Sequence, residues 1–140
     1  MEFLLHLSPQ SKEILNQIYK LKYSVKENIG YCRSNKDIFG YADFGKKFVI
    51  CTKNIKKSGE DVSHYINETL LHEAVHVAHH CNGYRPFWIS KKDMPLPEFK
   101  LQGVRDSVKN STASDQMEHE AYWMEDKPNK INYVIEKFCF

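Results

Sequence analysis

Several common features are missing from this chain of 140 residues, and each absence excludes a class of protein. No apolar run is long enough to cross a membrane, and the amino terminus, Met-Glu-Phe-Leu-Leu-His, lacks the basic and apolar regions of a secretory signal. The four cysteines, Cys32, Cys51, Cys81 and Cys139, form no Cys-x-x-Cys pair, so no zinc ribbon is indicated. We therefore expect reduced thiols in a cytoplasmic protein without a membrane partner.

Neither sign of charge predominates. The 20 basic and 18 acidic residues give a net charge of only +2, and the lysine pairs are short and separated. Proteins that bind nucleic acid concentrate basic residues on one face, so we expect no nucleic-acid partner. A content of 41% hydrophobic and 13% aromatic residues is typical of a compact globule, and residues 1–140 are long enough for one domain with its own core.

The most informative stretch is His72-Glu73-Ala-Val-His76, which lies within an apolar run. Residues four apart lie on one face of a helix, so His72 and His76 can hold one small cation. Glu73 lies beside them, where a carboxylate can take a proton from a metal-activated water.

Chance is the competing explanation for this motif. A chain with 7 histidines and this content of glutamate matches it by accident in roughly three of a hundred cases. The context favours a site, because two apolar stripes flank the motif and indicate a helix buried on two sides: Val62, Ile66, Leu70, Ala74 and Val77 form one, and Leu71, Val75 and Ala78 form the other. A buried helix must satisfy its polar side chains, and a metal ion would do so.

The first half of the chain predicts a helix followed by strands. Ser8-Pro9 is typical of a helix start, and the apolar spacing extends over residues 9–27. From Gly30 to Ile55 the β-branched and aromatic content favours strands, with a hairpin formed by 38–44 and 47–53.

The motif helix has a start and a stop of its own. Ser58 and Asp61 have the spacing of a capping box, and Asn82-Gly83 is typical of a helix end. His79 and His80 extend the histidine stripe, and we expect them to be exposed or to support the ligands rather than to bind metal. Residues 84–112, with prolines at the start, predict a long loop.

Two further helices are predicted after this loop, over 113–125 with Thr112 as cap and over 129–138. Two imidazoles leave a zinc site one protein ligand short. The first of these helices offers Glu118 and Glu120, on opposite sides of an apolar stripe, and either carboxylate could turn inward.

His72-Glu73-Ala-Val-His76, together with the later Glu118-His-Glu120-Ala121, resembles the zincin metallopeptidases, in particular the gluzincin type. The chain is also similar to small metallopeptidase-like proteins of cyanobacteria and their phages. The resemblance implies an α+β zincin-like domain, with a short hairpin or sheet packed on the central motif helix and two C-terminal helices. It implies Zn²⁺ bound by His72, His76 and Glu118, with Glu120 in reserve, and Glu73 as general base.

The resemblance also implies a peptide or protein substrate, bound along an edge strand for which residues 48–53 are the candidate. The oxyanion donor stays open among Tyr84, Arg85, His119 and Tyr122. Tyr122 also occupies the position where these enzymes often have an Asp or Asn that orients a zinc ligand. The alternatives are a zinc-binding domain without catalysis and a histidine-rich helix without metal.

Overall fold

The computed structural model describes all 140 residues. Its elements, in chain order, are α1 (Pro9–Lys20), β1 (Ser24–Glu27), α2 (Gly30–Ser34), β2 (Gly40–Ala42), β3 (Lys47–Ile50), α3 (Thr52–Lys57), α4 (Val62–Cys81), α5 (Glu98–Asn110), α6 (Asp115–Met124) and α7 (Pro128–Cys139), with 3₁₀ turns at Glu2–His6 and Lys91–Asp93. The α+β class is confirmed. None of the helices combines the length and the apolar character needed to span a lipid bilayer.

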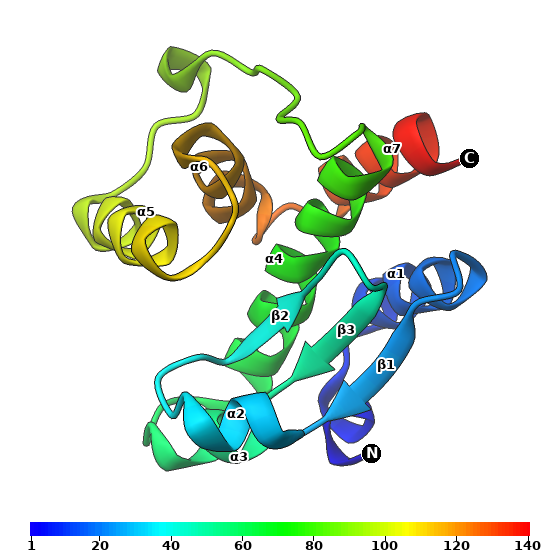
Figure 1. Cartoon of the computed structure of the whole chain (residues 1–140), viewed down its shortest axis with the longest axis vertical. Helices are drawn as coiled ribbons and strands as arrows, with labels where there is room; N and C mark the ends of the chain where they lie inside the picture. The colour runs from blue at the N-terminus through cyan, green and yellow to red at the C-terminus, as the bar shows by residue number, and fades with distance from the viewer.

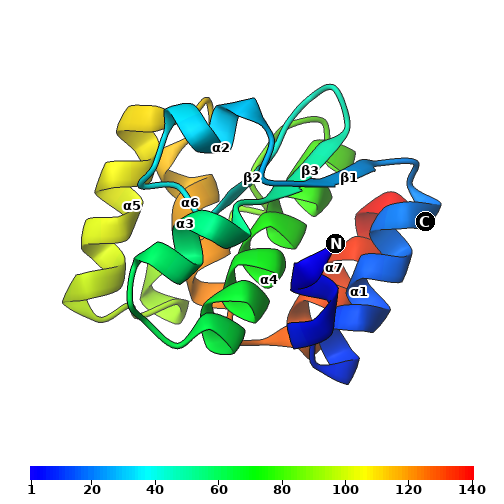
Figure 2. The same cartoon turned by 90° about the horizontal axis from the view of Figure 1, so that it is seen from below.

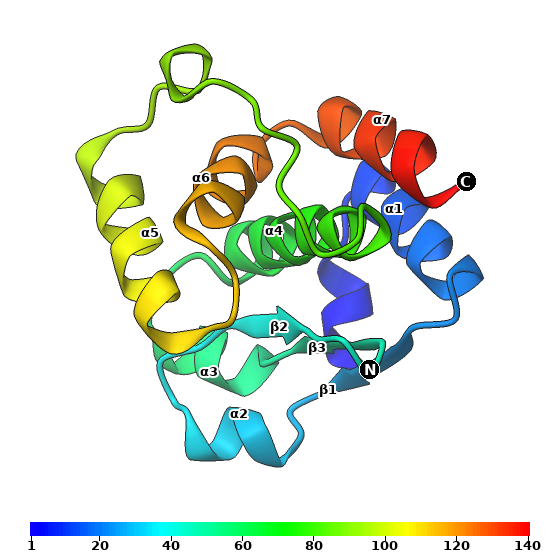
Figure 3. The ribbon, with the colours of Figure 1, turned by 45° about the horizontal axis from the view of Figure 1, so that its top comes forward.

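Helix α4 runs through the middle of the molecule (Figures 1 and 3). It packs against one face of the sheet, with α1 and α7 on one flank and α6 on the other, and α5 lies outside α6. The opposite face of the sheet carries α2 (Figure 2). The motif therefore lies on the most enclosed helix of the chain.

The sheet has the order β1-β3-β2, with β1 parallel and β2 antiparallel to β3. The predicted hairpin between β2 and β3 is confirmed, with Gly40 opposite Ile50. The prediction that residues 48–53 form an edge strand is wrong, because β3 has a neighbour on each side. The edge strand next to α4 is β2.

Strand β3 is apolar on both faces, as its sequence indicates. Phe48 and Ile50 join the main core with α1, α4 and α7, while Val49 and Cys51, the residue just after the strand, form a small second core with Cys32 of α2. Alternate side chains of a strand point to opposite faces, so this short strand packs against α4 on one face of the sheet and against α2 on the other.

Several predicted boundaries in the first half are wrong. The helix expected over 9–27 ends at Lys20, because Lys22 adopts a left-handed conformation (φ 68°) and the chain turns into β1. The strands expected over 30–55 give way at both ends to the short helices α2 and α3. Ser8 does cap α1, accepting a hydrogen bond from the Ser11 backbone N–H.

The predicted helix caps are partly wrong as well. Asp61 caps α4 by accepting from the His64 backbone N–H, and Ser58 instead ends α3. Ser114, not Thr112, caps α6. The stop at Asn82-Gly83 is confirmed, since Gly83 has φ 72°, and α7 lies where it is predicted.

The predicted loop over 84–112 contains α5 in its second half. Gly103 lies in the middle of this helix, and glycine weakens a helical sequence pattern. A Cβ at Gly103 would lie 2.7 Å from the Tyr122 ring, so the missing side chain lets α5 approach α6 closely. The glycine that obscures the helix in the sequence therefore makes its packing possible.

The cysteines form two disulfides, Cys32–Cys51 and Cys81–Cys139, and none is free. The expectation of reduced thiols is wrong. Each pair joins residues that are far apart in sequence and whose Cα atoms lie 5.5 and 5.2 Å apart in the fold. The second pair connects the C-terminal end of α4 to that of α7.

Removing the Cys81–Cys139 disulfide with a double serine variant should lower the free energy of unfolding by about 4 kcal/mol, against about 3 kcal/mol for Cys32–Cys51. Loop-closure entropy grows with the separation of the cysteines, which is 58 residues for the first pair and 19 for the second. Urea denaturation of the oxidised proteins measures both values. Four titratable thiols in native protein purified under oxidising conditions would contradict the pairing.

Gly40→Ala should destabilise the fold by about 1–3 kcal/mol, because overpacking forces the backbone to shift. Its Cβ would lie 2.6 Å from the Val49 carbonyl oxygen and 2.7 Å from Thr69 Cγ2, between β2 and α4. Gly30→Ala is the matched control, since the nearest atom would be 3.7 Å away, and it should change stability by less than about 0.5 kcal/mol. Equal effects of the two substitutions would refute the close approach of β2 to α4.

Candidate metal centre

Three donor atoms converge between α4 and α6. His72 and His76 lie one turn apart on α4, and Nε2 of each ring is 3.2 Å from Oε1 of Glu118 on α6. One ligand atom from each residue falls within 4.8 Å of the other two. The helices bring together the three residues predicted as metal ligands, and His76 and Glu118 are only 7% and 3% exposed.

The donor set suits zinc in type and in spacing. Zn²⁺ prefers imidazole nitrogen and carboxylate oxygen at bond lengths of about 2.0–2.2 Å. In a tetrahedral site with such bonds the ligand atoms lie about 3.4 Å apart. The two nitrogen–oxygen distances of 3.2 Å are close to that value.

The far side of the His72 ring is held by Glu125. Nδ1 of His72 donates to Glu125 Oε1 at 2.8 Å, so Nε2, which faces Glu118, is the nitrogen that is bare when His72 is neutral and can then bind a metal ion. Glu125 is 3% exposed, and Lys100 Nζ lies 3.3 Å from its second oxygen. A carboxylate behind a metal-binding histidine fixes the ring and its tautomer, and Glu125 is placed where it could do this for His72. The resemblance implied such a role for the residue at position 122.

Tyr122 does not take that role. Its ring packs edge-on against His72 with centroids 4.6 Å apart, and its hydroxyl pairs with Ser107 Oγ at 3.1 Å. Sequence reasoning missed Glu125, although its position seven residues after Glu118 places both carboxylates on one face of α6.

Glu120, the reserve ligand, lies on another side of α6. Its carboxylate is fully buried and accepts hydrogen bonds from His79 Nε2 at 2.8 Å and from the backbone N–H of Phe87 at 2.9 Å. Glu120 does not belong to the group of His72, His76 and Glu118 whose ligand atoms converge, called the converging group below. His79, expected to be exposed or supporting, is fully buried, and His80 is partly buried.

His72 and Glu118 shift each other's pKa values. Burial by itself would raise the pKa of Glu118, but His76 and His72 hold it far below its usual range, so the carboxylate is ionised. Burial would lower the pKa of His72, but hydrogen bonds to Glu118 and Glu125 hold it well above its usual value. In the absence of a metal, a proton on His72 therefore partly neutralises the anionic ligand, and a cation would displace it.

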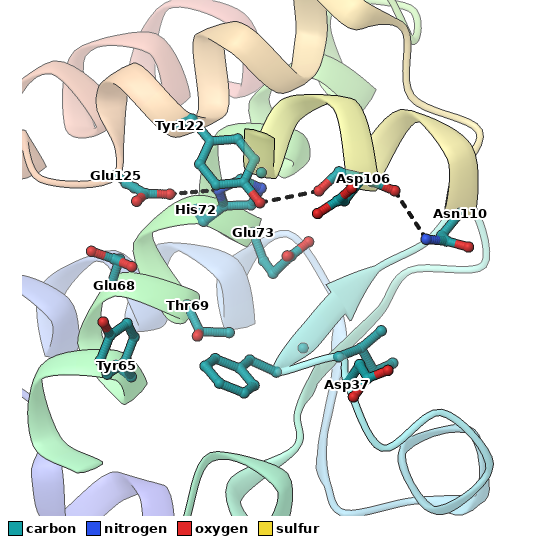
Figure 4. Close-up of a pocket in the computed structure, with 15 residues that line it drawn as sticks. Asp37, Tyr65, Glu68, Thr69, His72, Glu73, Asp106, Asn110, Tyr122 and Glu125 are labelled. Carbon is teal, nitrogen blue, oxygen red and sulfur yellow. Dashed lines mark hydrogen bonds and ion pairs between the residues drawn. The ribbon is translucent and has the colours of Figure 1, made fainter. Parts of the chain in front are cut away.

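Glu73 points from α4 into a hollow of about 620 Å³ beside His72 (Figure 4). Burial raises the pKa of its carboxyl, an effect that the neighbouring His72 and His76 partly offset. Four other carboxylates line this hollow, those of Asp37, Glu68, Asp106 and Glu125. A second hollow of about 200 Å³ lies on the His76 side, lined by Tyr31, Tyr41, Phe44 and Tyr84.

The four candidate oxyanion donors occupy different places. His119 is buried with Nε2 2.8 Å from the Met94 carbonyl oxygen, and Arg85 Nε donates to the Asn82 carbonyl oxygen. Tyr84 lines the smaller hollow and packs on Phe44, and Tyr122 lines the larger one. The two tyrosines border the hollows beside the converging group, whereas His119 and Arg85 bond to carbonyl groups elsewhere.

A family model described as a domain of unknown function, DUF8637, matches residues 3–140. The chain belongs to this family. Comparisons with curated proteins and with solved structures give no significant match. The interpretation of the site therefore depends on the geometry of its own side chains.

His76→Ala and Glu118→Gln should each weaken zinc binding by more than about 100-fold, because loss of even a partner behind a ligand costs about 10–100-fold. Isothermal titration calorimetry on metal-free protein measures the affinity and the stoichiometry. His64→Ala is the control: this side chain is on the same helix but 60% exposed, and its loss should leave the affinity unchanged. Stoichiometric zinc with wild-type affinity in both ligand variants would refute the site.

Proposed function

We propose that this chain is a zinc-dependent peptide hydrolase. The observation that carries the proposal is the convergence of His72, His76 and Glu118 in the wall of the smaller hollow, which Glu73 also lines. Two imidazoles, one carboxylate and an adjacent second carboxylate are the groups that metal-assisted hydrolysis requires. This combination agrees with the zincin resemblance of the motif.

Zinc bound by these three residues would lower the pKa of a water molecule to about 7 and polarise a substrate carbonyl. Glu73 is placed to take a proton from the attacking water and to return it to the leaving amine. Burial raises the pKa of its carboxyl, and a carboxyl with a raised pKa is a stronger base toward a water proton. By accepting from Nδ1, Glu125 would leave Nε2 of His72 as the nitrogen that binds the ion.

The surroundings favour an extended peptide as substrate. The outer side of β2 is unpaired, and an extended chain can add to such an edge through backbone hydrogen bonds. The two hollows share Gly40 of this strand together with His72 and Glu73. A peptide along β2 would thus pass from the carboxylate-lined hollow to the aromatic one, whose wall holds the metal position.

A zinc-binding domain without catalysis is the competing function, and the number of ligands separates the two. Structural zinc sites have four protein ligands, whereas catalytic ones have three and leave a position for water. The converging group consists of three side chains. The donor count therefore supports catalysis.

Glu73→Gln should retain stoichiometric zinc and lose peptide hydrolysis by about 100-fold or more, because a general base contributes about 10²–10⁴-fold. The assay incubates zinc-loaded protein with a mixture of synthetic peptides that covers all pairs of residue types, and mass spectrometry detects the cleavage products. Glu13→Gln, an exposed substitution on α1, is the control and should hydrolyse at the wild-type rate.

Two other results would contradict parts of the proposal. Unchanged hydrolysis in Glu73→Gln removes this residue from the mechanism. Stoichiometric zinc without cleavage of any peptide by the wild type identifies a binding domain and overturns the hydrolase proposal.

A further inference from the structure

The second histidine of the metal centre has an unusual partner. His76 Nδ1 lies 3.3 Å from Nδ1 of His79, which is on the next turn of α4. Two nitrogens can form a hydrogen bond only if one carries a proton and the other does not. Which of the two rings donates therefore depends on which nitrogen of His79 carries its hydrogen.

Glu120 determines which nitrogen of His79 carries its proton. Oε1 of Glu120 lies 2.8 Å from His79 Nε2, and a carboxylate only accepts, so Nε2 bears the hydrogen. Nδ1 of a neutral His79 is then bare and accepts from His76 Nδ1–H. With Nδ1 so occupied, Nε2 of a neutral His76, which faces Glu118 at 3.2 Å, is the nitrogen whose lone pair can bind a metal ion placed between the two.

The carboxylate of Glu120 is itself fixed by four donors and is fully buried. Oε1 accepts from His79 and from the Phe87 backbone N–H, and Oε2 accepts from the Ile89 backbone N–H at 3.2 Å and from Gln116 Nε2 at 3.0 Å. With these partners the group has no freedom to rotate away from His79. The segment after α4 is thereby joined to the same carboxylate.

We propose that Glu120 and His79 form a positioning relay that sets the tautomer and the ring orientation of His76 for metal binding. The relay rests on the metal site of the proposed function. It assigns a role to both Glu118 and Glu120 of α6. Glu118 would bind the metal, and Glu120 would orient the ligand His76 through the imidazole of His79.

Two substitutions of His79 separate the two ends of the relay. In His79→Gln the side-chain amide reaches the position of Nε2, so donation to Glu120 is kept and the acceptor for His76 is lost. In His79→Asn the amide oxygen lies near the position of Nδ1, so the acceptor for His76 is kept and Glu120 loses its partner.

His79→Gln should weaken zinc binding by about 10–100-fold, and His79→Asn by clearly less. The visible absorption bands of the cobalt-substituted protein should shift in His79→Gln, because they report ligand geometry. Hydrogen exchange of the Phe87 and Ile89 amides should stay slow in this variant, since both bonds to Glu120 remain. This last readout separates a role in metal positioning from a purely structural role of the pair.

An NMR measurement on the wild type tests the relay without any substitution. Imidazole ¹⁵N shifts of zinc-loaded protein should place the proton of His79 on Nε2 and that of His76 on Nδ1. A proton on Nδ1 of His79 would overturn the proposal, whatever the variants do.

The zinc affinities distinguish failure of the relay from failure of the metal site. Wild-type zinc affinity in His79→Gln, or equal losses in both variants, overturns the relay and leaves the proposed function standing. If the wild type itself binds no stoichiometric zinc, the metal site fails and the relay fails with it.

Discussion

Helix α4 is enclosed by the sheet, α1, α6 and α7, yet it carries three imidazoles in its buried half. A buried polar group without a partner costs on the order of a few kcal/mol, so each ring must find one. His72, His76 and His79 all find theirs on the same neighbour, in the carboxylates of Glu118, Glu120 and Glu125. The docking of α6 on α4 is therefore both a packing contact and a network of hydrogen bonds.

The spacing of the three carboxylates along α6 determines which histidine each of them contacts. Glu118 and Glu125 are seven residues apart and lie on one face, so one reaches the Nε2 atoms and the other the Nδ1 of His72. Glu120 lies on another side of the helix and meets His79 together with the segment after α4. Burial lowers the pKa of His79 to about 4. Burial by itself would raise the pKa of Glu120, but hydrogen bonds from His79, Gln116 and Phe87 hold it below its usual value. This pair is thus a neutral imidazole beside an ionised carboxylate.

The rest of the fold holds this helix pair beside an open strand edge. Ala121, fully buried, lets α6 approach α4, and Gly40 lets β2 approach α4 from the other side. The Cys81–Cys139 disulfide ties the end of α4 to α7. A helix packed in this way next to a short unpaired strand would suit the proposed function, in which a metal ion is held in place while an extended chain binds beside it.

The sequence by itself determined the features that depend on neighbours a few residues away. These are the motif helix with its stop at Asn82-Gly83, the hairpin of β2 and β3, the helices α6 and α7, and the candidate ligands His72, His76 and Glu118. Caps, turns and helical periodicity act over one or two turns, so local composition reveals them. Even there, a glycine hid α5 and a competing serine displaced the expected cap of α6.

Only the tertiary structure decided which distant residues meet. The disulfide partners lie 19 and 58 residues apart, and His72 meets Glu125 across 53 residues. The separation of Glu120 from the cluster of His72, His76 and Glu118, the contact between His76 and His79, and the position of β2 at the sheet edge are likewise decided by packing. A local pattern shows that a buried imidazole needs a partner, but which partner it finds depends on how the helices dock.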